Sequence, residues 1–193
     1  RQTKVLFQDR HYHTCSTSSG TGLFHRFVPF FGQVFGLCLS TDRLISDYNS
    51  RNGSTGDSHH MTVAIIVHGG AGGWNVSEER LGQALQACAD ATKAGRELLM
   101  NGGSALDAVE LAVTILEDCP VLDAGRGSYP NAEGDVEMDA LIMDGRDLSM
   151  GAIAAIQRVR HPISLARRVM LESGHNFLVG KGADAFADRI AFP

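Results

Sequence analysis

The chain has no excess of basic residues and no hydrophobic run long enough to cross a membrane. Its 193 residues include 17 Lys and Arg against 22 Asp and Glu, which gives a formal net charge of -5. Because binding to phosphates requires a basic surface, this balance argues against a nucleic acid as the main partner. The most apolar stretch, residues 27–39, contains Pro29 and Gln33 and is shorter than the roughly 20 residues of a membrane-spanning helix. We therefore expect no membrane partner.

Close cysteine pairs are also missing. The cysteines form no Cys-x-x-Cys motif and no regular framework of spacings, which predicts free thiols in a reducing compartment and a cytoplasmic protein. His11, His13 and Cys15 lie close in sequence, but no second pair of ligands follows them to complete a metal site. The four cysteines are Cys15, Cys38, Cys88 and Cys119.

The first 60 residues lack a sustained helical or strand period. Ser, Thr, Gly, Asn and Asp crowd into residues 14–21 and 46–58, which predicts a disordered leader or a non-homologous extension. The chain begins at Arg1, and Met61 opens a segment of different character, so Met61 is a credible true start. We expect residues 61–193 to form the folded domain.

Residues 61–193 alternate between strand and helix patterns. The β-branched run at 62–67 predicts a buried strand, and Ser77 and Ser104 are expected to cap two helices, the second with an apolar stripe over 105–116. Strands at 136–143 and 151–156, with Asp144 and Gly145 between them, predict an antiparallel hairpin. A helix at 163–171, a strand at 177–179 and the start of a helix at 183–189 follow. Helices beside a partly antiparallel sheet indicate a layered α/β or α+β fold.

Five sequence blocks occur in this region in a characteristic order. They read HGGAG at 68–72, GGSALDAV at 102–109, LEDCP and then DAGRGS within 116–128, VEMDALIMDG at 136–145, and HPISLAR at 161–167. In order and spacing they resemble the N-terminal, α-subunit portion of the plant-type L-asparaginase/isoaspartyl peptidase family. Residues 1–60 take no part in the resemblance.

The resemblance implies an N-terminal nucleophile hydrolase with a four-layer αββα sandwich, of which this chain would hold an incomplete part. Such precursors cut themselves before a threonine, whose freed amine then serves as the base for its own hydroxyl. The implied substrates are L-asparagine and β-aspartyl (isoaspartyl) dipeptides. The implied partners are the C-terminal (β) segment and a second αβ unit in a homodimer. The family's Thr-Val-Gly block does not occur here, so we expect no catalytic residue in this chain and the nucleophilic threonine beyond Pro193.

Two loops are candidates for site residues under the same resemblance. The loop after the first strand would assist precursor processing at the active site, although a flexible turn, or a dinucleotide loop lacking its third glycine, would also fit its pattern. Residues 116–126 resemble the family's sodium loop, in which main-chain carbonyls surround a structural sodium ion; no other cofactor is expected. Asp123 stands where the family commonly has an asparagine near the substrate, which changes the charge and hydrogen-bonding groups there. The glycine loop comprises His68, Gly69, Gly70, Ala71 and Gly72, and the sodium carbonyls would belong to Leu116, Glu117, Cys119, Leu122, Ala124 and Arg126.

Other functions remain open at this point. Glu137 and Asp139 share one face of a predicted strand and would serve either as a carboxylate pair for acid–base chemistry or as charges facing solvent. One alternative is a non-catalytic truncated product that acts as a binding or dimerising fragment. Such a product would lack the same threonine. A relative of the lysosomal glycosylasparaginases is disfavoured because the sequence has no convincing signal peptide.

Overall fold

A computed structural model of the chain describes residues 2–6, 35–40, 63–70 and 76–193; in the first two segments it describes the strands and their pairing. The described strands form one six-stranded sheet in the order β3-β2-β1-β4-β5-β6. The strands are β1 (Gln2–Leu6), β2 (Phe35–Ser40), β3 (Val63–His68), β4 (Met138–Met143), β5 (Met150–Ile156) and β6 (Phe177–Val179). The helices are α2 (Glu78–Met100), α3 (Ala105–Glu117), α4 (Pro162–Glu172) and α5 (Lys181–Arg189), with a 3-10 turn η1 (Gly125–Gly127).

The predicted hairpin of β4 and β5 is confirmed, but its loop is longer than an Asp-Gly turn. The strands pair antiparallel, and the amide of Asp144 donates to the carbonyl of Ser149 over 2.8 Å. The buried Asp144 carboxylate accepts a hydrogen bond from the backbone amide of Arg146 at 2.9 Å and also pairs with the Arg146 guanidinium. This local side-chain bonding holds a wider loop in place of a two-residue turn.

Strands β1 and β2 lie in the region for which the sequence predicted no regular structure. They pair with each other and fill the space between β3 and β4, antiparallel at every contact. Each has only five or six residues, which is too few to give a clear periodic signal. The rest of residues 1–60 lies outside the described part of the chain, so the assignment of a leader stays a prediction.

The predicted helix caps are confirmed at both seryl positions. The hydroxyl of Ser77 accepts a hydrogen bond from the amide of Arg80 at the start of α2. At the start of α3, Ser104 and Asp107 form a reciprocal capping box. Both caps satisfy amide groups that the first helical turn leaves without a partner.

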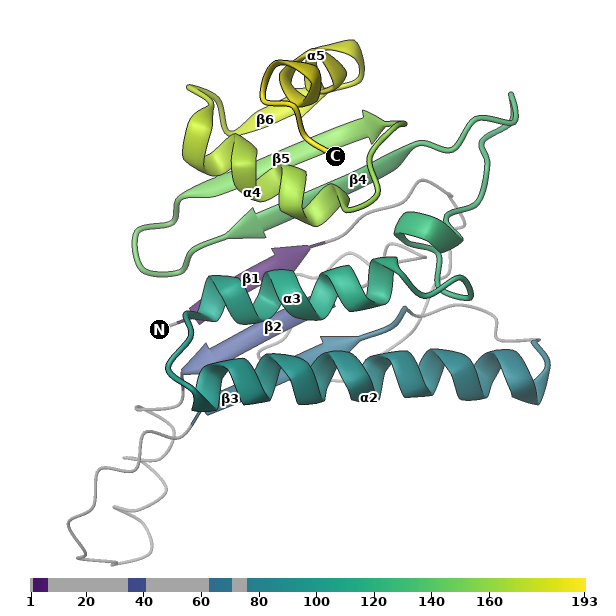
Figure 1. Ribbon diagram of the computed structural model, residues 1–193, viewed down its shortest axis with the longest axis vertical. Helices are drawn as coiled ribbons and strands as arrows, with labels where there is room; N and C mark the ends of the chain where they lie inside the picture. The colour runs from purple at the N-terminus through teal and green to yellow at the C-terminus, as the bar shows by residue number, and fades with distance from the viewer. Residues whose placement is uncertain (1, 7–34, 41–62, 71–75) are drawn as a thin grey trace, which may run out of the picture.

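Helices α2, α3 and α4 lie side by side over one face of the sheet (Figure 1). Helix α2 packs on β3, α3 on β1 and β2, and α4 on β4 and β5. The stripe predicted for 105–116 faces inward, and Val109, Ala112, Val113 and Leu116 are fully buried. The mixed helix-and-strand class is therefore confirmed, and none of the helices in the described segments is long and apolar enough to span a membrane.

Candidate functional site

The structure brings the two candidate loops together. Gly69, directly after β3, lies so close to its neighbours that a Cβ there would be 2.6 Å from Sγ of Cys88 and 3.6 Å from a methyl carbon of Leu122. Leu122 belongs to the predicted sodium loop, and Cys88 lies on α2. A side chain at position 69 would therefore require the Cys88 side chain to move.

The glycine loop is described only as far as Gly70. Gly70 has a φ of 112°, and its amide donates to Nδ1 of His68 over 3.2 Å, so the chain turns sharply at the end of the strand. The remaining predicted loop residues, Ala71 and Gly72, lie outside the described residues. The role of the loop in processing is untested and stays a prediction.

Several carbonyl groups of the predicted sodium loop converge on two glycines. A Cβ on Gly127 would collide with the carbonyl oxygen of Leu122 and lie 2.9 Å from that of Cys119. A Cβ on Gly125, whose φ is 53°, would lie 2.5 Å from the carbonyl oxygen of Glu117. Carbonyl groups that crowd around residues without side chains are the type of oxygen surface that a hard cation prefers.

Some of the predicted carbonyl ligands already accept hydrogen bonds inside the loop. Leu116 accepts from the amide of Cys119 at 3.1 Å, Cys119 from that of Leu122 at 3.3 Å, and Ala124 from that of Gly127 at 3.1 Å. A carbonyl oxygen has a second lone pair, so these contacts leave each group able to coordinate a cation. No group of three acidic, His or Cys side chains suited to a metal occurs among the residues that the structure describes. Coordination of a cation by these main-chain carbonyls therefore stays a prediction.

Ser128, which follows this loop, was missed by the sequence analysis. Its hydroxyl oxygen is buried and has no hydrogen-bond partner in the structure. A buried hydroxyl normally has a partner, so a water molecule or ligand group beside it would satisfy it. Its buried position beside η1 depends on loop geometry, for which the sequence contains no periodic signal.

Glu117 has a side-chain role that the sequence analysis also missed. Its carboxylate is fully buried; Oε1 accepts from the amide of Ile163 at 2.9 Å, and Oε2 lies 3.3 Å from Nδ1 of His161. Burial raises the pKa of this carboxyl group to about 7, although the hydrogen bond from His161 opposes the shift. The same hydrogen bond raises the pKa of His161. Glu117 thus fixes the start of α4 against the loop at the end of α3.

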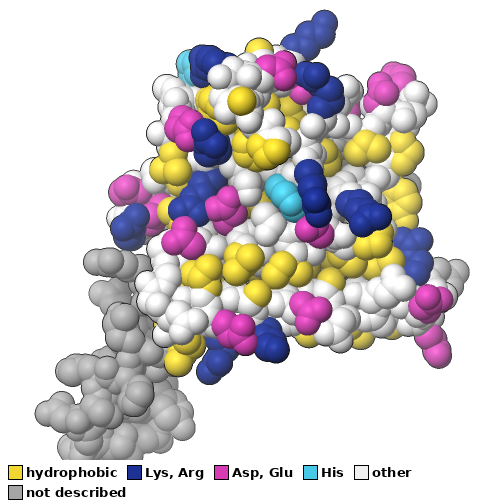
Figure 2. Space-filling model, in the orientation of Figure 1, with side chains coloured by type: hydrophobic (Ala, Val, Ile, Leu, Met, Phe, Trp, Pro, Cys, Tyr) yellow, Lys and Arg dark blue, Asp and Glu magenta, His cyan; other side chains and the backbone are white. Residues whose placement is uncertain are grey.

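Ion pairs reinforce the contact between α3 and α4. The Arg167 guanidinium lies 2.6 Å from the carboxylate of Asp107 and 2.5 Å from that of Glu110. Arg160 pairs with Asp118 at 2.9 Å. Figure 2 shows acidic and basic side chains interspersed over this helical face. The Arg residue of the HPISLAR block thus has a structural role as a bridge between two helices.

Asp123 closes its own loop in this structure. Its Oδ1 accepts a hydrogen bond from the amide of Tyr129 at 3.0 Å. Arg80 reaches the same region from α2, with one nitrogen 3.5 Å from the carbonyl of Val121 and 3.4 Å from the hydroxyl of Tyr129. The expected position of Asp123 near a substrate is not tested by these contacts.

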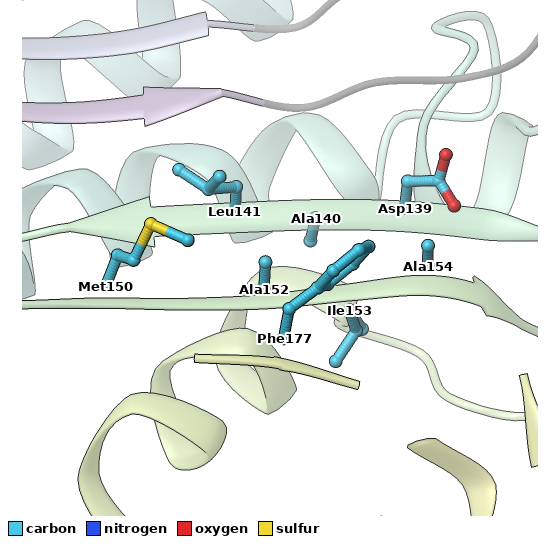
Figure 3. A pocket seen from close by; sticks show the side chains of 8 residues that line it. All are labelled: Asp139, Ala140, Leu141, Met150, Ala152, Ile153, Ala154 and Phe177. Atoms are coloured by element: carbon cyan, nitrogen blue, oxygen red, sulfur yellow. The ribbon is translucent and has the colours of Figure 1, made fainter. Parts of the chain in front are cut away.

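Of the two predicted carboxylates, Asp139 lies on β4 and Glu137 directly precedes that strand, and both are partly buried. Oδ1 of Asp139 accepts from the amide of Ala155 at 2.8 Å, where the pairing register of β4 and β5 shifts and Ala155 has a φ of 52°. Asp139 therefore supports a β-bulge, a role that alternation along the strand could not indicate. It also borders a largely apolar cavity of about 340 Å³ on the sheet face away from the helices (Figure 3), with Leu141, Met150 and Phe177.

Comparisons with known proteins agree with the order of the sequence blocks. The family model described as Asparaginase matches residues 61–193. The chain is 47% identical over 133 residues to the isoaspartyl peptidase/L-asparaginase of Rattus norvegicus, covering 69% of this chain and 40% of the relative. It is 51% identical over 131 residues to the plant-type L-asparaginase of Pyrococcus abyssi, covering 68% of this chain and 42% of the relative. The chain thus spans about two fifths of the length of these relatives, and it belongs to the asparaginase family.

Proposed function

We propose that the protein to which this chain contributes hydrolyses L-asparagine and β-aspartyl (isoaspartyl) dipeptides. The observation that carries the proposal is the family match over residues 61–193, with relatives named for both activities at 47% identity. The reaction transfers the aspartyl acyl group to a nucleophile and then to water.

The threonine nucleophile is expected in sequence that follows Pro193, because the 193 residues contain no Thr-Val-Gly block. Its amine would act as the base for its hydroxyl. In this scheme the present chain supplies the scaffold and the two adjoining loops. The carbonyls around Gly125 and Gly127 would hold a sodium ion that stiffens the loop facing Gly69.

The further layers of the αββα sandwich are part of the same proposal. Ile66 on β3 and Phe177 and Val179 on β6 are about half exposed, so the sheet face opposite the helices keeps apolar side chains that a second sheet would bury. The C-terminal segment and a second αβ unit are the proposed partners. The free thiols of Cys88 and Cys119 support a cytoplasmic location.

The decisive test measures ammonia release from L-asparagine and aspartate release from a β-aspartyl dipeptide. We expect no turnover by the 193-residue chain alone, and turnover when it is co-expressed with a segment that contains a Thr-Val-Gly block. Solubility should also rise on co-expression. Turnover by the chain alone that disappears in Thr62→Ala would make Thr62 the nucleophile and overturn this scheme.

The sodium proposal has its own test. Thermal unfolding of the co-expressed protein is compared in sodium chloride and tetramethylammonium chloride at equal ionic strength, since a cation bound only by the folded state raises the midpoint by linkage. Gly127→Ala should abolish the difference because its methyl group would collide with the carbonyl oxygen of Leu122 and displace the loop. Equal midpoints for the unsubstituted protein in the two salts would rule out the sodium site.

A non-catalytic product that binds or dimerises is the second candidate. Persistent lack of turnover after co-expression, together with a stable folded chain, would support this alternative.

A further inference from the structure

Two cysteines with free thiols lie toward the open end of the α2–α3 helical hairpin, Cys88 on α2 and Cys119 two residues after the end of α3. We propose that Cys88 and Cys119 form a reversible intramolecular disulfide that locks the loop after α3 onto α2. The inference does not depend on the proposed activity.

Packing within the hairpin supplies the geometric argument. Near its closed end, a Cβ on Gly95 would lie 3.7 Å from Cβ of Ala112 and 3.2 Å from the carbonyl of Ala108, so the two helices are in close contact there. Seven residues make about two helical turns and return to the same helix face. In an antiparallel pair, seven residues back from Gly95 is Cys88, and seven residues on from Ala112 is Cys119.

Helix α3 ends at Glu117, and backbone hydrogen bonds to the helix continue for two further residues, as far as Cys119. The amide of Asp118 donates to Thr114 at 3.0 Å, and that of Cys119 donates to Leu116 at 3.1 Å. Helix axes 8–10 Å apart place facing Cα atoms roughly 4–6 Å from each other, which matches the spacing of disulfide-bonded cysteines. Both thiols are partly exposed, and the neighbouring Cys119 adds to the effect of burial in raising the pKa of the Cys88 thiol.

The position of the pair gives the bond a structural consequence. Sγ of Cys88 packs against Gly69 of the glycine loop, and Cys119 lies within the predicted sodium loop. A bond between the two sulfurs would move Cys88 Sγ relative to Gly69 and fix Cys119 to α2. Oxidation would therefore act on both candidate loops at once.

The oxidant is a low-molecular-weight disulfide of the glutathione class. One protein thiolate attacks it, forming a mixed disulfide and releasing one small thiol. The second protein thiolate then attacks the protein sulfur and releases the other small thiol. In total two protein thiols lose two electrons and two protons, and the small disulfide is reduced to two thiols.

The test uses the full chain with Cys15→Ser and Cys38→Ser, and in parallel the unsubstituted chain, in buffers of reduced and oxidised glutathione. Remaining thiols are alkylated, and linked peptides are mapped by mass spectrometry. We expect the peptides of Cys88 and Cys119 to be joined in both proteins, and the bond to be lost with dithiothreitol. At a fixed ratio of the two glutathione forms, oxidation should fall as total glutathione rises, because an intramolecular bond releases two small thiols.

Matched controls separate this bond from general thiol reactivity. Cys88→Ser and Cys119→Ser, each made in the same background, should instead take up one glutathione. In urea, formation of the 88–119 bond should fall at least tenfold in equilibrium constant. Glutathione adducts on each cysteine without the bond, or equal bond formation in urea, would overturn the proposal.

Discussion

The two faces of the sheet are covered very differently by the described residues. On the helical face, residues of α3 such as Val113 and Leu116 are fully buried. On the other face, Ile66 is 52% exposed and Phe177 is 53% exposed, and an apolar cavity lies beside Asp139 (Figure 3). Because side chains alternate between faces along a strand, the same strands supply both surfaces.

The difference indicates that the described residues stabilise mainly the helical face of the sheet. Residues 76–193 contain the helices for one face together with their caps, ion pairs and buried carboxylate. The corresponding cover for the second face is not found among the described residues. Substitutions on the two faces should therefore have unequal effects, and the predictions below use that inequality.

The largest expected effect is the loss of a core side chain on the helical face. Leu116→Ala should lower the free energy of unfolding by about 3–5 kcal/mol, because Leu116 is completely buried and its removal leaves a cavity. Ile66→Ala on the other face should cost less than about 1 kcal/mol, since Ile66 already contacts solvent. Urea unfolding of the full chain measures both values. Equal losses would mean that the second face is covered in solution.

The next effect concerns the buried Glu117. Its carboxyl pKa is raised from 4.5 to about 7, so the folded state keeps a proton that the unfolded state loses, and stability should fall as pH rises through this interval. The pKa of His161 is also raised above its ordinary value of about 6.5, so the loss of its proton at higher pH should lower stability as well. The full shift of Glu117 corresponds to a loss on the order of 3 kcal/mol between pH 4.5 and 8.

Glu117→Gln is the matched variant for this pH effect. The amide oxygen can still accept from Ile163 but cannot titrate, so the decline in stability between pH 4.5 and 7 should disappear. Denaturant midpoints at several pH values measure the two slopes. A Gln variant that keeps the full slope would assign the effect to another group.

A smaller effect is expected at the β-bulge. Asp139→Ala removes the acceptor for the amide of Ala155 and should cost about 1–2 kcal/mol. Asp139→Asn retains an oxygen acceptor and should cost less. Hydrogen exchange of the Ala155 amide provides a local measurement, in which the Ala variant alone should lose protection. Unchanged protection in Asp139→Ala would show that the Asp139 side chain does not stabilise the bulge.

Elements whose residue pattern is local were predictable from the sequence. The Ser104–Asp107 capping box and the apolar period of α3 depend on residues three or four positions apart, so the sequence alone indicates both. The hairpin of β4 and β5 followed from alternation, while its wider loop depends on side-chain bonds of Asp144. Strands β1 and β2 pair with β4 and β3, which are distant in sequence, and a local residue pattern does not indicate such pairing.

In the candidate site, the glycine positions could be predicted from the sequence, and the side-chain contacts could not. Glycine-rich turns can be located from residue type, and Gly125 and Gly127 occupy positions where a Cβ would collide with backbone atoms. The contacts of Glu117 with Ile163 and of Arg167 with Asp107 join residues more than 40 positions apart. Their chemistry depends on burial and distance, which emerge only when α3 and α4 pack together.

The smallest effect on stability should occur on the open face, where association provides the measurement. Phe177→Thr replaces a side chain that is 53% exposed with one that still favours a strand, so the free energy of unfolding should change by less than about 1 kcal/mol. Exposed apolar surface beside a sheet promotes contact between molecules, so the same variant should associate less at high concentration. Leu171→Gln is the control, because Leu171 is 61% exposed but lies on α4. Sedimentation velocity over a range of concentrations should show reduced association for Phe177→Thr only. Equal reductions in both variants would mean that association is driven by exposed apolar residues in general, and that the open face has no special part in it.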